Sequence, residues 1–346
     1  MKISMLSSLS GRRVAFTMAE ILLSLTIIGV VAAITLPSLT GNINERTWNT
    51  QRKALYSRMS QAIALIDNLR GYGRLTQTGA GNEWGGGKSY EFGDSTEAFL
   101  SGGLSKVMKL NNICDASHIT DCGMPNQIVD MAGSKVQIDG SAMGQLTSLN
   151  EAFAGNGCAY FYVNGNNAAF ETANGESVLA FYNPICKDMH TAIEAGALMQ
   201  PSVVMCLNFV YDLNGRKGPN TVGKDIGFMS VFYPYDSVVV APMPLLKDAA
   251  SGVTFQNASR ACTSQSDEYR IPNKEEFMSI GLNAKFVGQA FQYGDYWTSS
   301  ILERTINEWH EEGQPFVWHN ETSSMGARME LWPKTSTASV KCIKRF

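Results

Sequence analysis

Apolar residues dominate the first part of the chain, and their spacing predicts one long helix. The run Ile21–Leu36 contains no charged residue. Farther along, apolar side chains recur at roughly helical spacing between basic ones, at Ile43, Trp48, Leu55, Met59, Ile63, Ile66 and Leu69. Such a helix is apolar all round at first and one-sided later. As an α-helix, Phe16–Leu39 would be about 36 Å long, which is enough to span a bilayer core of about 30 Å.

The pattern changes to short β-rich runs from Val129 onward. We expect strands at Lys135–Ile138, Ala159–Val163, Ala168–Phe170, Ser177–Phe181, Val203–Tyr211 and Gly227–Tyr233. The Asn-Gly pairs at 164–165 and 174–175 favour hairpins between antiparallel strands. A short helix, Ser95–Leu110, is expected before them, with Ser95 or Thr96 as its N-cap. This order predicts an α+β fold in which an antiparallel sheet packs against the long helix.

One carboxylate lies at the edge of the uncharged segment. Glu20 follows the basic pair Arg12-Arg13 and immediately precedes the apolar run. An acidic residue within hydrocarbon costs roughly 2.5–3.5 kcal/mol, so Glu20 is a candidate functional group. The simpler alternative is an ordinary membrane anchor in which Glu20 lies among the lipid headgroups.

The segment from 12 to 66 resembles the N-terminus of type IV prepilins and of type II secretion pseudopilins. The resemblance implies that a prepilin peptidase cuts between Ala15 and Phe16, that Phe16 becomes N-methylated, and that Glu20 acts in assembly. In a filament, the amine of Phe16 would pair with Glu20 of a neighbouring subunit, and loss of one partner would leave a buried charge unpaired. The implied partners are other pilin subunits, the peptidase and an inner-membrane assembly machinery. The chain would be a single-pass precursor in the inner (cytoplasmic) membrane and then part of an extracellular or periplasmic filament.

The C-terminal region carries a second pattern. In order, it contains a helix ending at Cys262, a segment Tyr269–Phe277 that opens a second helix at Pro272, a strand with Tyr296-Trp297, and a final strand with Cys342. This order resembles the C-terminal domains of the Lcl type, which are C-type-lectin-like in fold. The resemblance implies that Arg270 and Glu276 tie their segment into the core. We therefore expect a leader at 1–15, a transmembrane and stem helix at 16–72, a pilin-like globular domain at 73–245 and a C-type-lectin-like α+β domain at 246–346.

Two tryptophans of this region are candidates for ligand binding. Polar residues surround Trp309 and Trp318 in the sequence, and aromatic side chains serve as anchors with little conformational entropy to lose. The ligand would be a surface glycan or protein. For each of these residues, and for Tyr296 and Trp297, burial in a hydrophobic core is the alternative.

The cysteines point to disulfides on the exported side of a membrane. All seven follow the apolar segment, where an oxidising compartment permits pairing. Cys114 with Cys122 would close a short loop, and Cys262 with Cys342 would bracket the C-terminal region. The other three, Cys158, Cys186 and Cys206, leave one odd thiol, and their pairing stays open. The formal net charge is −3, so the charge does not indicate a nucleic-acid partner.

Hard oxygen ligands gather between the last two predicted strands. The segment 211–226 contains the side chains of Asp212, Asn214, Asn220 and Asp225, which are of the kind that calcium takes. It is not an EF-hand, because Arg216 stands where that loop needs another oxygen. Similar loops in prepilin-like proteins resemble the calcium loop of the major pseudopilin. A loop held by its own Asx turns is the alternative, and the sequence leaves both open.

No pattern typical of catalysis stands out. The four histidines form no H-E-x-x-H motif, and the sequence contains no G-x-S-x-G elbow. We therefore expect a minor pilin-like subunit of a type IV filament that displays an adhesive C-terminal domain, and not an enzyme. The alternative is a structural pseudopilin of a type II secretion or DNA-uptake system.

Overall fold

The computed structural model describes residues 18–70, 95–138, 167–182, 204–233, 237–240, 249–288, 294–303, 311–320 and 328–344. The predicted cleavage junction, Ala15 and Phe16, lies outside these residues, as does the strand expected at 159–163. Glu20 lies in a helix, but its side chain is not among those described. By its internal contacts the chain divides into two compact units, Met1–Thr47 and Trp48–Phe346.

The helix α1 comprises 53 residues, Met18–Arg70, which agrees with the long helix expected from the spacing of apolar residues. Within the ranges that the structure describes, no helix combines the length and the apolar character needed to cross a membrane.

The later part of α1 buries one stripe of side chains. Leu55, Met59, Ala62, Ile63 and Ile66 are all buried, at the spacing expected for one face of a helix. They form a core cluster with residues of the sheet. Burying side chains of this size stabilises the fold by on the order of 10 kcal/mol in total. The apolar pattern therefore predicted the face by which α1 is held.

A six-stranded antiparallel sheet forms the centre of the unit Trp48–Phe346, in the order β1-β4-β5-β6-β7-β8. Its strands are β1 (Leu110–Asp115), β4 (Ala168–Thr172), β5 (Ser177–Tyr182), β6 (Val204–Asp212), β7 (Ile226–Tyr233) and β8 (Ser237–Val240). A two-stranded hairpin, β2 (Gln127–Val129) with β3 (Lys135–Gln137), lies outside this sheet. Five of these strands, namely β3, β4, β5, β6 and β7, match predicted ones closely, whereas β1 begins at the last residue of the predicted helix Ser95–Leu110.

That predicted helix ends early. It consists of α2 (Thr96–Phe99), a π-helical turn η1 (Leu100–Leu104) and α3 (Ser105–Val107). Ser95 is the N-cap, because its side chain accepts a hydrogen bond from the amide of Ala98.

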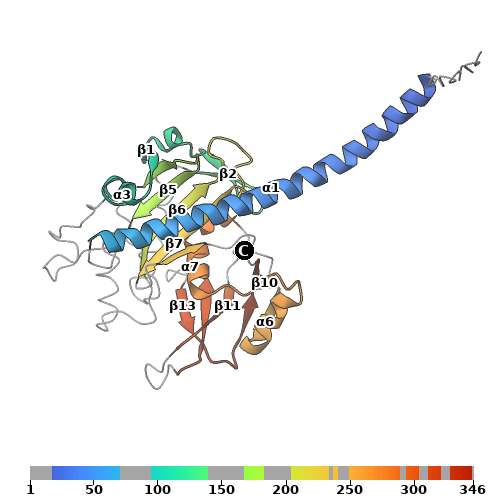
Figure 1. Cartoon of the computed structure of the whole chain (residues 1–346). Helices are drawn as coiled ribbons and strands as arrows, with labels where there is room; N and C mark the ends of the chain where they lie inside the picture. The colour runs from blue at the N-terminus through green and yellow to red at the C-terminus, as the bar shows by residue number, and fades with distance from the viewer. Residues whose placement is uncertain are drawn as a thin grey trace, which may run out of the picture. The chain divides into compact units, whose positions relative to one another are not determined.

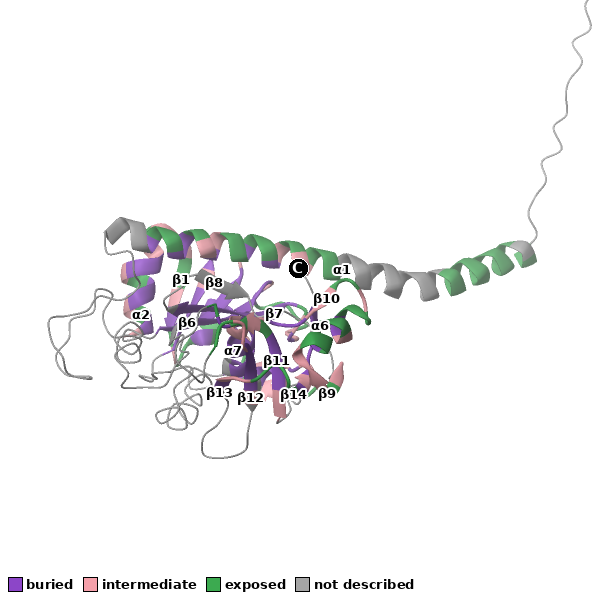
Figure 2. Ribbon diagram, turned by 90° about the horizontal axis from the view of Figure 1, so that it is seen from below, coloured by how far each residue is buried: buried purple, intermediate pink, exposed green. Residues whose placement is uncertain are grey.

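The central sheet is covered on both faces. Along β5, Val178 and Ala180 belong to the cluster under α1, whereas Leu179 and Phe181 belong to a cluster on the opposite face. Figure 1 shows the later, lighter-blue part of α1 along one face of the sheet and α7 at the other. Figure 2 shows the buried strands between these two layers. An antiparallel sheet that is apolar on both faces requires a cover on each side.

The C-terminal region supplies the second cover. Its elements are β9 (Ala250–Thr254), α6 (Phe255–Thr263), β10 (Tyr269–Arg270), α7 (Lys274–Leu282), α8 (Ala284–Val287), β11 (Gly294–Ile301), β12 (Pro315–Asn320), β13 (Arg328–Leu331), β14 (Thr337–Val340) and β15 (Ile343–Lys344). Five of its strands form one sheet in the order β13-β12-β11-β14-β9, and β10 pairs with β15.

The region after 245 shares its core with the central sheet. Phe277 and Trp318 pack in the same cluster as Leu179, Phe181 and Phe228. The structure therefore groups Trp48–Phe346 in one compact unit, and does not divide it near the expected boundary at 245. The expectation of a boundary rested on the order of segments along the chain, which carries no information about packing between distant segments.

A buried polar network also joins the two regions. Asn208 of β6 and Asn283 exchange two side-chain hydrogen bonds, with N···O distances of 3.0 and 3.2 Å. Ser230 of β7 donates to Asn208 and lies 2.7 Å from the hydroxyl of Ser279 in α7. Because buried polar groups need specific partners, this network orients α7 on the sheet.

The α7 segment confirms one expectation and corrects another. Arg270 forms two hydrogen bonds with the carboxylate of Glu276, at 2.7 and 2.5 Å, so this pair ties the segment together as expected. The helix begins after Asn273, which forms a capping box with Glu276. It does not start at Pro272, because an asparagine side chain satisfies the exposed amides of the first turn, which proline cannot do.

Candidate metal centre

The loop Asp212–Asp225 joins β6 to β7, so its two aspartates lie where neighbouring antiparallel strands meet. Asp212 is the cross-strand partner of Ile226, the residue after Asp225. Both aspartates are fully buried, at 0% exposure each. Asn220 has a positive φ of 51°, a conformation that asparagine tolerates better than most residues. The loop therefore places four oxygen-bearing side chains on a tightly folded backbone.

Backbone amides donate hydrogen bonds to some of the oxygens of these side chains. Asp225 accepts hydrogen bonds from the amides of Asn220 and Thr221, both at 2.8 Å. Oδ1 of Asp212 accepts one from the amide of Asn214 at 3.0 Å. The contact of Asp212 with Asn214 is an Asx turn, whereas Asp225 binds amides that precede it in the loop. The loop is therefore held in part by its own side chains, as the alternative interpretation requires. Asp225 shapes the loop, because amides already occupy both of its oxygens.

Three oxygen atoms of the same loop accept no hydrogen bond from any group that the structure describes. They are Oδ2 of Asp212, Oδ1 of Asn214 and Oδ1 of Asn220, and all three are inaccessible to solvent. Nδ2 of Asn214 donates to the carbonyl of Gly218 at 3.1 Å, which directs its Oδ1 elsewhere. A buried polar group without a partner costs about 1–3 kcal/mol. Internal turns alone therefore leave the loop incomplete.

The electrostatics of Asp212 also favour a cation at this loop. Burial, assisted by the negative charge of Asp225, raises the pKa of Asp212 to about 8, against the opposing effect of the backbone amides of Asn214 and Gly215. A carboxyl group in this environment gains from a nearby positive charge, because the charge offsets both causes of the shift.

The donor set fits a hard cation. Oxygens of carboxylates and amides are the ligands that calcium takes, usually six to eight of them with backbone carbonyls and waters included. Asp212, Asn214 and Asn220 would hold the ion, with Asp225 supplying a second negative charge. No group of three or more His, Cys, Asp or Glu side chains suited to a metal occurs in the described part of the chain. The segment 211–226 contains no histidine or cysteine, so its donor set is not of the kind that zinc and other nitrogen- or sulfur-seeking metals prefer.

In calcium-free buffer, we expect the contribution of Asp212 to the free energy of unfolding to fall as the pH rises from about 4 to about 8. Folded Asp212 keeps its proton up to about pH 8, whereas an aspartate in an unfolded chain ionises near pH 4. The contribution of the protonated group is therefore complete below pH 4 and lost as the pH rises through the folded pKa, by at most about 1.4 kcal/mol per pH unit. Urea unfolding in the presence of a chelator at several pH values measures it.

The matched control for that slope is Asp212→Asn, which cannot ionise. It should be more stable than the wild type at pH 8 without calcium, and the difference should shrink towards pH 4. Parallel curves for the two proteins would contradict the assignment.

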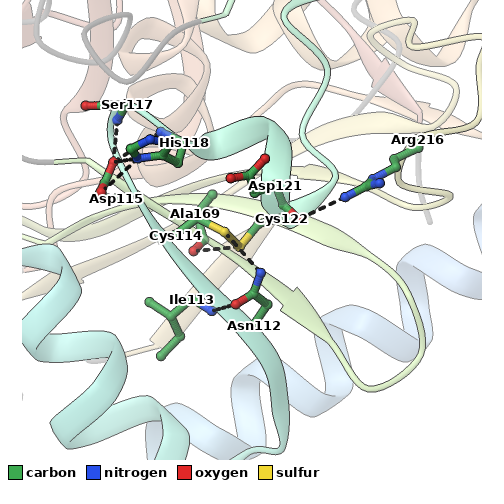
Figure 3. The surroundings of a disulfide bond; sticks show 10 residues. All are labelled: Asn112, Ile113, Cys114, Asp115, Ser117, His118, Asp121, Cys122, Ala169 and Arg216. Carbon is green, nitrogen blue, oxygen red and sulfur yellow. Dashed lines mark hydrogen bonds and ion pairs between the residues drawn. A yellow bond between two sulfur atoms is a disulfide. The ribbon is translucent and has the colours of Figure 1, made fainter.

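Neighbouring segments hold the loop in place. The amide of Val129 in the β2–β3 hairpin donates to the carbonyl of Asn220 at 2.8 Å. Nη2 of Arg216 donates to the carbonyl of Asp121 at 3.0 Å, next to the disulfide between Cys114 and Cys122 (Figure 3). The arginine that excluded an EF-hand therefore anchors the loop to the disulfide-bonded segment.

The sequence did not reveal two residues beside this loop. Ser177 is the cross-strand partner of Asp212, and its buried hydroxyl also lacks a partner among the described groups. Arg52 is only 3% exposed. Its spacing, four residues after Trp48 and three before Leu55, places it on the buried face of α1. No local pattern shows that either residue meets the loop, because each reaches it through pairing or packing between segments far apart in sequence.

The aromatic candidates are corrected. Trp318 is 2% exposed, and its ring stacks on Phe277 with 6.4 Å between the ring centroids. Tyr296 and Trp297 are buried as well. The register explains this, because Tyr296 pairs with Trp318 across β11 and β12 and cross-strand partners share a face. Trp309 lies outside the described residues.

Two predicted disulfides are present. Cys114 is bonded to Cys122, and Cys262 is bonded to Cys342. Cys206 is also disulfide-bonded; Cys158 and Cys186, which the sequence analysis grouped with it, lie outside the described residues.

Comparisons with known proteins give little guidance. No protein-family model matches the chain, and no curated protein matches it. Among solved structures, the chain is similar to rhodocetin, a snake C-type-lectin-like protein, at 17% sequence identity. That match covers 28% of this chain and 86% of rhodocetin. The TM-score is 0.20, which is too low to support an argument about fold or function.

Proposed function

We propose that this protein is a minor pilin-like subunit of a type IV filament, with a calcium-binding loop in its globular part and a C-terminal C-type-lectin-like module for adhesion. It would be made as a single-pass precursor in the inner membrane, be cut by a prepilin peptidase before Phe16, and join other pilin subunits through the assembly machinery.

The observation that carries the proposal is the contrast between the two parts of α1. Its early part exposes large apolar side chains, namely Met18, Ile21, Leu22, Leu23, Leu25, Ile27, Ile28, Val30 and Val31. Such a surface requires a partner, because contiguous apolar patches are unfavourable in water. The later part is held on an antiparallel sheet by one stripe. A stem of this kind would pack first among lipids and then among the stems of other subunits.

The proposal of a C-terminal adhesive module is supported by a disulfide that crosslinks this region. The disulfide Cys262–Cys342 joins residues 80 positions apart. It links α6, which contains Cys262, to the segment between β14 and β15. The lectin-type ligand would be a glycan or protein of a surface. Because Trp318 is buried, the contact surface would come from other residues of this region.

Processing and assembly test the proposal. The intact mass of the protein from sheared filaments should correspond to a chain that begins with N-methylated Phe16. Glu20→Ala should enter the membrane normally but be incorporated into filaments at a strongly reduced level, because the amine of Phe16 would lose its partner. Immunoblotting of sheared and membrane fractions measures both.

Glu97→Ala, which changes an exposed acidic residue of α2, is the matched control and should assemble normally. A mature protein that retains residues 1–15, or normal incorporation of Glu20→Ala, would leave only a simple membrane anchor.

A further inference from the structure

Arg52 of α1 contacts the Asp212–Asp225 loop near both of its ends. Nη2 donates to the carbonyl of Lys224 at 2.7 Å and to that of Gly223 at 3.4 Å. Nε donates to the hydroxyl of Tyr211 at 3.1 Å. On the helix side, Nη1 donates to Oδ1 of Asn49 at 2.6 Å. One buried guanidinium group therefore joins the stem helix to the start and the end of the loop.

The two loop contacts stand next to the two aspartates in sequence. Tyr211 immediately precedes Asp212, and Lys224 immediately precedes Asp225. The guanidinium group is planar and presents its donors in a fixed fork, so it fixes the Tyr211 hydroxyl and the Lys224 carbonyl relative to each other. The Lys224 carbonyl belongs to the peptide group that leads into Asp225, so this contact fixes the backbone from which the Asp225 carboxylate extends.

We propose that Arg52 is a positioning residue of the cation site, and that cation binding and docking of α1 on the sheet stabilise each other. This inference rests on the proposed calcium loop. Ordering a flexible loop opposes ligand binding, and a loop already tied at both ends requires less ordering. Coupling of this kind is reciprocal, so an ion that orders the loop must strengthen the attachment of α1 by the same factor.

A second arginine of α1 provides a matched control. Arg58 is ion-paired with Glu176, which belongs to the β4–β5 turn, and also donates to the carbonyl of Ala54. It therefore attaches the same helix to the same sheet through a segment other than the loop. If attachment of α1 in general were enough, loss of either arginine would affect the cation site equally.

Calcium titration calorimetry on the full-length protein in detergent micelles tests the inference, with wild type, Arg52→Met and Arg58→Met compared. We expect the dissociation constant for calcium to rise about tenfold in Arg52→Met and to change little in Arg58→Met. In hydrogen exchange measured by mass spectrometry, calcium should slow exchange in residues 48–66 of the wild type and of Arg58→Met, but not of Arg52→Met.

The outcomes separate the inference from the proposed site. If the wild type binds no calcium, the proposed cation site is wrong and the inference falls with it. If the wild type binds calcium and Arg52→Met binds equally well, or Arg58→Met is weakened as much, the role of Arg52 is overturned while the site stands. If Arg52→Met does not fold, hydrogen exchange of the wild type tests the inference by itself. Exchange in residues 48–66 that stays unchanged at saturating calcium overturns the inference.

Discussion

Calcium should raise the melting temperature of the full-length protein by about 5 °C or more at 100 times the dissociation constant, and Asp212→Ala with Asp225→Ala should abolish the rise. An ion that binds only the folded state stabilises it by about 2.7 kcal/mol at that excess, and each kcal/mol shifts the melting temperature by a few degrees in a protein of this size. The double variant removes both carboxylates of the loop, so the remaining amide oxygens would bind a dication weakly. Differential scanning fluorimetry with calcium or with chelator measures the shift.

Asp115→Ala is the control for this experiment. Asp115 is exposed and paired with His118, outside the loop, so its variant should keep the full response to calcium. Equal melting temperatures of the wild type with calcium and with chelator would leave the loop as a set of Asx turns.

Loss of the disulfide Cys262–Cys342 should be the most destabilising cysteine change. In the chain-entropy model, a crosslink between residues 80 positions apart contributes about 4.5 kcal/mol, whereas one between residues 8 apart contributes about 2.5 kcal/mol. Both cysteines of the longer crosslink are fully buried, so paired alanine substitutions preserve an apolar interior. Urea unfolding of Cys262→Ala with Cys342→Ala should show the larger loss in the free energy of unfolding.

Cys114→Ala with Cys122→Ala is the matched pair, since it removes a crosslink of the same kind from the same compact unit. Because Phe277 and Trp318 pack against the central sheet, unfolding should remain one transition in both variants. A separate early transition of the C-terminal region would contradict the shared core.

Several features followed from the sequence alone. The stripe Leu55, Met59, Ile63 and Ile66 was predicted from spacing, because a helix brings every third or fourth residue to one face whatever surrounds it. An N-cap at Ser95 or Thr96, and the strands around Asn174-Gly175, likewise depend on residues close in sequence. The four polar residues of the Asp212–Asp225 loop were recognised for the same reason. The resemblance implied a structural role for Arg270 and Glu276, and the structure shows that they pair with each other.

Other features depended on how distant segments meet. The sequence left open whether the loop closes on its own turns or holds an ion, and the proposal of an ion is supported by three buried oxygens without a partner among the described groups, which only the tertiary structure reveals. Trp318 has polar neighbours in sequence, yet strand pairing and α7 bury it. The spacing of Arg52 puts it on the buried face of its helix, but no local pattern shows that it reaches the loop across 172 positions. Local periodicity determines which face a side chain takes, but only the tertiary structure determines what that face meets, because contacts between distant segments leave no local pattern.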